Sequence, residues 1–283
     1  MGHGKGFGRH GIRGLRGSAL LATTLGVLGL TGCVNLDPQS VNGRDGGGQV
    51  PSYAALMRIG AAAQSGGDVE NALGVYRRAA QLAPSDPAPL VAAGDALLQI
   101  GNANEAIVSY NAALVRPGPD QPALSGLAKA YLMTGKPELA LDPISKALAE
   151  SADDPKLLLL MGVTRDLSGQ HQEAQAWYRR GLALAPGDRS LTLDLALSLA
   201  LNGDYPGAIA MLRPVAMSPA GSAHERQTLA LIYGVSGNAT EAARLARIDL
   251  DTPSVESNLA YYETLRKLSP EARNRAILAG RSS

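Results

Sequence analysis

The chain has 283 residues, with 26 Lys and Arg against 25 Asp and Glu, 45% hydrophobic residues, 4% aromatic residues and one Cys. This hydrophobic content supports a sizeable core and excludes global disorder, while the scarcity of aromatic residues favours packed helices rich in Ala and Leu over a β-sandwich. A single Cys excludes an internal disulfide framework and a zinc site built from several Cys ligands.

The near-neutral net charge is the sum over two segments of opposite charge. Residues 1–32 contain four basic residues and no acidic residue, which leaves 22 basic against 25 acidic residues, a net charge of −3, for residues 33–283. A weakly acidic body without a cluster of Lys and Arg argues against nucleic acid as a partner.

The N-terminal segment has the layout of a secretory signal peptide. A basic, Gly-rich stretch over residues 1–17 precedes thirteen mostly apolar residues, 18–30, which are too few to span a bilayer as a mature helix. The next positions, Leu30, Thr31, Gly32 and Cys33, resemble the lipobox of bacterial lipoproteins, in which the Cys thiol is acylated and becomes the mature N-terminus. We therefore predict a lipoprotein signal peptide over 1–32 and lipidation of Cys33. The alternative is that Cys33 is an ordinary small residue near a cleavage site.

The residues after Cys33 predict where the protein is held. Val34, rather than Asp, follows the Cys, and in the lipoprotein class this implies retention at the periplasmic face of the outer membrane. Residues 34–52 show no apolar periodicity and contain three consecutive Gly. We predict that 33–52 is a lipidated Cys followed by a flexible linker with a reach of roughly 24 Å, which tethers the body to the membrane.

Residues 53–256 repeat with a period of 34. A Gly recurs six times without an insertion, an Ala follows each Gly by five residues, and a Gly or Ala precedes it by seven. The Gly series is Gly67, Gly101, Gly135, Gly169, Gly203 and Gly237, and the preceding series is Gly60, Gly94, Ala128, Gly162, Ala196 and Ala230. We expect the recurring Gly to end the first helix of a pair with positive φ, and the small residues to let the two helices approach closely.

This pattern resembles that of tetratricopeptide repeats, each a helix–turn–helix of 34 residues. The resemblance implies an all-α fold, a right-handed α-solenoid of six repeats. The predicted repeats are 53–86, 87–120, 121–154, 155–188, 189–222 and 223–256. The usual Trp near the start of the first helix is replaced by Leu56, Leu90, Leu124, Leu158, Thr192 and Arg226.

After residue 256 the period ends, and we predict C-terminal capping helices and a tail over 257–283. Ser269, Pro270 and Glu271 are typical of a helix start, and the helix should run to about Ala279. The alternative to a cap is a tail that binds a partner.

No arrangement of residues predicts catalysis. His171 and His224, the two His after Cys33, fall in different repeats and are expected to be solvated residues at helix ends. Asp153 and Asp154 precede Pro155 at a repeat boundary, where Asp favours turns and helix starts. Because metal-ligand spacings, phosphate-binding loops and nucleophile motifs are absent from the sequence, we expect no enzyme activity, no cofactor, no metal and no small-molecule substrate.

Tetratricopeptide domains bind partners along the face lined by the first helix of each repeat. The family's groove positions carry over to two series, Ala61, Asp95, Lys129, Val163, Leu197 and Leu231, and Gln64, Leu98, Leu132, Asp166, Ala200 and Gly234. From these and two neighbouring Leu we predict a largely apolar partner-binding groove made of Leu98, Lys129, Leu132, Leu159, Val163, Leu193, Leu197 and Leu231. Such a groove suits an apolar peptide or an amphipathic helix. The alternative is that the C-terminal segment folds back over it.

Two stretches of the segment 258–273 carry a further resemblance, NLAYYETL at 258–265 and LSPEAR at 268–273. They resemble the closing segment of the TadD-type component of the Tad (Flp) pilus assembly system, which shares the lipobox and the repeat array. The resemblance implies a non-enzymatic, lipid-anchored scaffold for protein–protein interaction in tight-adherence pilus assembly. Our hypothesis for its mechanism is pilotin-like assistance to an outer-membrane secretin. A general adaptor in outer-membrane protein or cell-envelope assembly, and an envelope enzyme with an unrecognised site, remain as alternatives.

Overall fold

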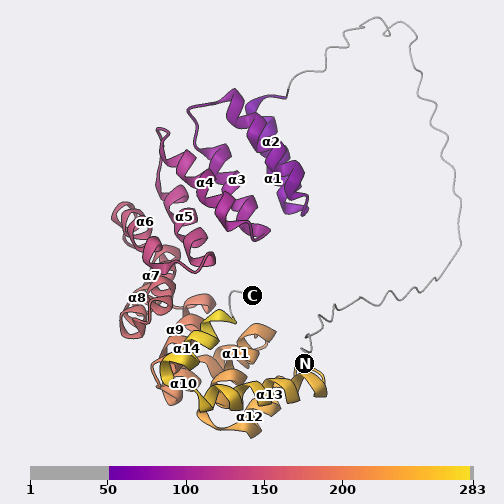
Figure 1. The fold of residues 1–283 in the computed structure, drawn as a ribbon, viewed down its shortest axis with the longest axis vertical. Helices are drawn as coiled ribbons and strands as arrows, with labels where there is room; N and C mark the ends of the chain where they lie inside the picture. The colour runs from indigo at the N-terminus through magenta and orange to yellow at the C-terminus, as the bar shows by residue number, and fades with distance from the viewer. Residues whose placement is uncertain (1–50, 281–283) are drawn as a thin grey trace, which may run out of the picture. The chain divides into compact units, whose positions relative to one another are not determined.

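The computed structural model describes residues 51–280, in which fourteen helices and no strands occur (Figure 1). The predicted signal peptide, the lipobox with Cys33 and the linker up to residue 50 lie outside the described residues. The helices are α1 (Tyr53–Ser65), α2 (Val69–Leu82), α3 (Ala88–Gln99), α4 (Ala103–Leu114), α5 (Gln121–Met133), α6 (Pro137–Glu150), α7 (Pro155–Leu167), α8 (His171–Leu184), α9 (Arg189–Leu201), α10 (Tyr205–Ala216), α11 (Ala223–Ser236), α12 (Ala239–Ala246), α13 (Thr252–Lys267) and α14 (Pro270–Ala279). None of these described helices is long and apolar enough to cross a membrane.

Helices α1 to α12 form six pairs. Each helix packs against the next one along the chain, and the first helix of each pair also contacts the first helix of the following pair. This arrangement confirms the predicted all-α repeat fold. Since the first helices lie side by side, they share one surface, which we call the first-helix face and which α1, α3, α5, α7, α9 and α11 carry.

The turn inside each pair depends on the recurring Gly. The six residues adopt left-handed backbone conformations, with φ from 71° at Gly135 to 99° at Gly237. Residues with a Cβ rarely adopt such values, whereas Gly does so without strain. The structure thus confirms that this Gly ends the first helix and reverses the chain.

The three Gly of the second series, Gly60, Gly94 and Gly162, make room for buried Tyr rings. At Gly162 of α7 an added Cβ would lie 2.3 Å from the ring of Tyr178 in α8, a side chain with no exposed surface. Gly94 of α3 meets Tyr110 of α4 in the same way, at 2.6 Å. The close approach of paired helices is therefore a fit between a missing side chain and an aromatic ring.

Helix α13 covers the last pair. It packs against α11 and α12 and buries Val255, Tyr262 and Leu265. A Cβ at Gly234 of α11 would lie 2.2 Å from the Tyr262 ring, so the capping helix reuses the contact between a Gly and a Tyr. It begins at Thr252, and the predicted repeat boundary at 256 therefore falls within it.

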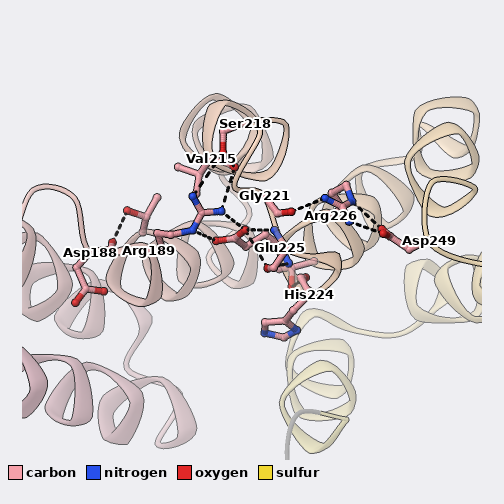
Figure 2. A network of polar contacts seen from close by, with 12 residues as sticks. Asp188, Arg189, Val215, Ser218, Gly221, His224, Glu225, Arg226 and Asp249 are labelled. Carbon is pink, nitrogen blue, oxygen red and sulfur yellow. Dashed lines mark hydrogen bonds and ion pairs between the residues drawn. The ribbon is translucent and has the colours of Figure 1, made fainter. Parts of the chain in front are cut away.

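An ion-pair network joins the last two pairs at the N-terminal ends of α9 and α11 (Figure 2). Arg189 donates from Nε to Oε1 of Glu225 at 2.8 Å, and its second guanidinium nitrogen contacts Oε2. The Ser222 amide donates to the same carboxylate at 2.8 Å. Arg226 forms a similar pair with Asp249, at 2.8 Å from Nε to Oδ2. These contacts hold α11 against α9 and against the segment after α12.

The Glu225 carboxylate is 4% exposed and ionised within this network. Burial raises its pKa, but hydrogen bonds from Arg189 and Ser222 outweigh burial and leave the pKa below its usual value of 4.5. A carboxylate with a lowered pKa stabilises the fold above its unfolded-state pKa, and that stabilisation disappears as the pH falls through the folded-state pKa.

We predict opposite effects of Ala at two helical Gly. Gly162→Ala forces a methyl group onto the buried Tyr178 ring and should lower the free energy of unfolding by about 1–3 kcal/mol. Gly74→Ala in α2 meets open space and should raise it by up to about 1 kcal/mol through helix propensity. Urea unfolding followed by circular dichroism measures both, and a Gly162→Ala chain as stable as wild type would contradict the proposed fit.

We also predict that Glu225→Gln lowers the free energy of unfolding by about 1.5 kcal/mol at neutral pH. This free-energy change is at the low end for a hydrogen bond to a charged group, because the Arg189 side chain is 39% exposed. The difference from wild type should be complete above pH 4.5, the usual pKa of Glu, and shrink as the pH falls below it. Glu263→Gln, on an exposed pair with Lys267, is the matched control and should change little. A deficit for Glu225→Gln that stays constant on acidification would contradict this account.

Candidate functional site

The predicted groove residues all lie on first helices, but they differ in exposure. They are Leu98 on α3, Lys129 and Leu132 on α5, Leu159 and Val163 on α7, Leu193 and Leu197 on α9, and Leu231 on α11. Lys129 is exposed and the others are partly buried, except for Leu193 and Leu197, which are 9% and 5% exposed. The exposure of the predicted groove residues therefore differs from helix to helix and is lowest on α9.

Helix α14 covers the end of this face carried by α9 and α11. Ile277 and Leu278 of α14 are buried in one cluster with Leu197, Leu201 and Val235, and Leu231 packs against that cluster. Figure 1 shows α14, in yellow, next to α9. Over α9 and α11 the structure thus has the C-terminal segment folded back, the alternative left open in the sequence analysis, and not an open groove.

A single amide anchors α14 to the repeats. Nδ2 of Asn274 donates to the carbonyl oxygen of Leu201 at 2.8 Å and lies 3.0 Å from Nε2 of His171. Nδ1 of His171 lies 2.8 Å from Oδ1 of Asp166. With Nδ1–H donating to that carboxylate, Nε2 is free to accept from Asn274. Two residues separated by 103 positions in the sequence are thereby joined.

The expectation that His171 is solvated is wrong. Its side chain is 11% exposed, because the Asp166 carboxylate on one side and Asn274 of α14 on the other enclose the imidazole. His224 is exposed, as predicted.

Asp166 is the centre of a buried polar cluster. Its carboxylate accepts hydrogen bonds from the hydroxyl of Tyr178 at 2.9 Å and from Oγ of Ser198 at 2.8 Å, in addition to the contact with His171. These donors satisfy a charge that is only 2% exposed. The cluster ties α7 to α8 and α9 and positions the imidazole that receives α14.

Ser, His and Asp meet in this cluster, but they are not arranged for nucleophilic catalysis. Ser198 donates to Asp166 and to the carbonyl oxygen of His171, at 3.2 Å, and not to the imidazole. A nucleophile must give its proton to a base that a third group orients. Here the hydroxyl donates its hydrogen bond to the carboxylate and not to the imidazole, so the arrangement is that of a structural anchor.

A separate pocket of about 430 Å³ lies on the α3 part of the face. Val91 and four prolines, among them Pro87 and Pro119, line it together with the carboxylates of Asp86 and Asp95. Asp95 accepts a hydrogen bond from the hydroxyl of Tyr110 at 2.7 Å, and burial together with this bond raises the pKa of Tyr110. The pocket thus combines an apolar lining with two acidic groups.

Sequence reasoning missed the residues that anchor α14. Asp166 was a groove position by family analogy, and Ser198 stands 32 residues after it, close to one repeat length, which is a usable signal for contact. Arg189 and Glu225 are likewise 36 residues apart. No such spacing connects His171 with Asn274. Within residues 51–280, no group of three His, Cys, Asp or Glu is suited to hold a metal ion.

Comparison with known proteins agrees with the repeat architecture. The tetratricopeptide repeat family model matches residues 44–87, 91–155 and 167–221. No curated protein shows significant similarity to the chain.

Solved structures with a similar fold include three bacterial proteins. A tetratricopeptide repeat protein from Parabacteroides merdae is 17% identical with a TM-score of 0.63 over 76% of this chain and 86% of its own. PilF from Pseudomonas aeruginosa is 17% identical with a TM-score of 0.60 over 74% of this chain and 97% of its own. MamA from Desulfovibrio magneticus is 20% identical with a TM-score of 0.52 over 57% of this chain and 92% of its own. At such identities the likeness concerns the fold alone. The helix pairs, their Gly turns and the match over more than half of the sequence place the chain in the tetratricopeptide repeat family.

Proposed function

We propose that this protein is a non-enzymatic scaffold that binds other proteins through its first-helix face, anchored by a lipid on Cys33 at the periplasmic face of the outer membrane. The observation that carries the proposal is the docking of α14. A helix already lies on the face, held by two aliphatic side chains and one amide. A surface that accepts this helix has the chemistry to accept a helix from a partner.

The part of the face around Leu98 of α3 and Lys129 of α5 is where a partner meets the least competition. Lys129 is exposed, and neither it nor Leu98 lines a pocket shared with α14. The nearby pocket with Asp86 and Asp95 adds a site for a basic side chain, since two carboxylates at the edge of an apolar cavity favour a cation with an apolar stem.

The proposed role is the assembly of a Tad (Flp) pilus, with pilotin-like assistance to an outer-membrane secretin. Its support is the resemblance of the segment 258–273 to the TadD-type component. That segment forms most of α13 and the start of α14, the two helices that cap the array and cover the first-helix face. The distinctive segment thus leads directly into Asn274, Ile277 and Leu278, the residues of α14 that cover the proposed binding surface.

A general adaptor in outer-membrane protein or cell-envelope assembly is the second candidate, because it would use the same fold and anchor. Genes for a pilus ATPase, a prepilin peptidase and a secretin beside this one would favour the pilus role. An enzymatic role gains no support from the Asp166 cluster, in which the hydroxyl of Ser198 faces a carboxylate.

Photo-crosslinking in cells tests the partner. A photoreactive residue at Lys129 should capture a secretin or another pilus component, identified by mass spectrometry. The control position is Val108 on α4, a second helix, where the side chain is 68% exposed. Capture of the same proteins from both positions, or of no envelope protein from Lys129, would contradict the proposed binding face.

The anchor has its own test. Cys33→Ser should abolish labelling with radioactive palmitate, because the thiol that accepts the lipid is gone. Val34→Asp should keep the lipid and shift the protein from the outer to the inner membrane. Labelling of Cys33→Ser with palmitate at the wild-type level would refute lipidation at this position.

A further inference from the structure

The attachment of α14 is small for a helix in this position. Of its residues Pro270–Ala279, Ile277 and Leu278 are the two buried ones. A helix of ten residues is marginal in water on its own, so its helical state depends on this contact. The helix is therefore held by few interactions that a competitor could replace.

The neighbouring helix α13, by contrast, is firmly seated. Val255 and Leu265 are each 1% exposed, and Tyr262 packs on Gly234. Between the two helices Leu268 is extended, with φ −80° and ψ 156°, and Ser269 is the N-cap of α14. Release of α14 would thus leave the cap on the last pair in place.

The fit between α14 and the face is incomplete. A pocket of about 610 Å³ lies beside Asn274 and His171, and one of about 400 Å³ lies between Ile277 and Leu197. Two more, of about 350 and 340 Å³, flank Leu278 near Leu132. Oδ1 of Asn274 is buried without a hydrogen-bond partner. A bulkier helix that filled these spaces and satisfied its polar groups would gain contacts that α14 does not make.

We propose that α14 is an exchangeable occupant of this site, and that the site receives an amphipathic helix from a protein partner. The partner helix carries Asn or Gln at one position and aliphatic side chains three and four residues later, the spacing of Asn274, Ile277 and Leu278 on one side of α14. The amide pairs with His171 and the carbonyl of Leu201, while the aliphatic pair enters the cluster around Leu197. This inference rests on the proposed function, that the first-helix face binds partner proteins.

The exchange predicts a competition that can be measured with the purified mature chain and a fluorescein-labelled peptide of residues 269–280. Leu278→Lys places a charge in the buried cluster and should release the chain's own α14. The peptide should then bind this variant at least about tenfold more tightly than it binds wild type, because the site is no longer occupied. Ala279→Lys adds the same charge at an exposed neighbour and should behave like wild type. Fluorescence anisotropy gives the affinities.

The peptide itself provides the second arm. With Ala at the position of Asn274 it should bind Leu278→Lys about fivefold more weakly, and with Lys at the position of Leu278 it should not bind measurably. Equal affinity of the unmodified peptide for wild type, Leu278→Lys and Ala279→Lys would overturn the proposal. If circular dichroism shows that Leu278→Lys is unfolded, the full chain with Asn274→Ala replaces it. The peptide should then bind Asn274→Ala more tightly than wild type, and equal affinity would overturn the proposal.

Two further outcomes are decisive. If light scattering shows a dimer and crosslinks join α14 of one copy to the face of another, the occupant is a second copy and the proposal fails. Because the assay contains only this chain and its own peptide, its failure leaves capture from Lys129 untouched. Successful exchange without capture of a pilus component would instead refute the pilus role alone.

Discussion

The fold depends on a backbone constraint that recurs every 34 residues, a Gly with positive φ at the turn of each helix pair. This turn places the first helices of successive pairs side by side, and Gly residues such as Gly162 let the paired helix approach with a Tyr ring between them. A continuous first-helix face exists only because six turns have the same geometry. Everything proposed about binding follows from that face.

The Asp166 carboxylate connects the repeats to the C-terminal helix α14 through His171. Its three hydrogen-bonding neighbours come from α8 and α9, and one of them, His171, continues the chain of contacts to Asn274 of α14. A buried charge of this kind is tolerated because every contact is a donor. The Arg189–Glu225 pair joins α9 to α11 at their N-terminal ends, opposite to the ends near Asn274. Together they fix the surface on which α14 rests.

The repeat architecture could be predicted from the sequence because each of its causes is local. Turn Gly, small residues and buried Tyr recur at fixed offsets, and every groove candidate within the array fell on a first helix. The covering of Leu197 by α14 could not be derived, because it depends on contacts between residues about 100 positions apart. For the same reason the enclosure of the His171 side chain by Asn274 of α14 could not be derived from the sequence. Contacts between residues about one repeat length apart, such as Arg189 with Glu225, are harder to predict than the local features and easier to predict than these distant contacts.

Hydrogen exchange read by mass spectrometry is the most direct test of the central claim, that α14 occupies the first-helix face. The amides of residues 270–279 should exchange slowly in wild type, and rapidly in Leu197→Asp, which puts a charge beneath Ile277. Helix α13 should remain protected in both chains. Rapid exchange of residues 270–279 in wild type, at the rate found in Leu197→Asp, would contradict the account.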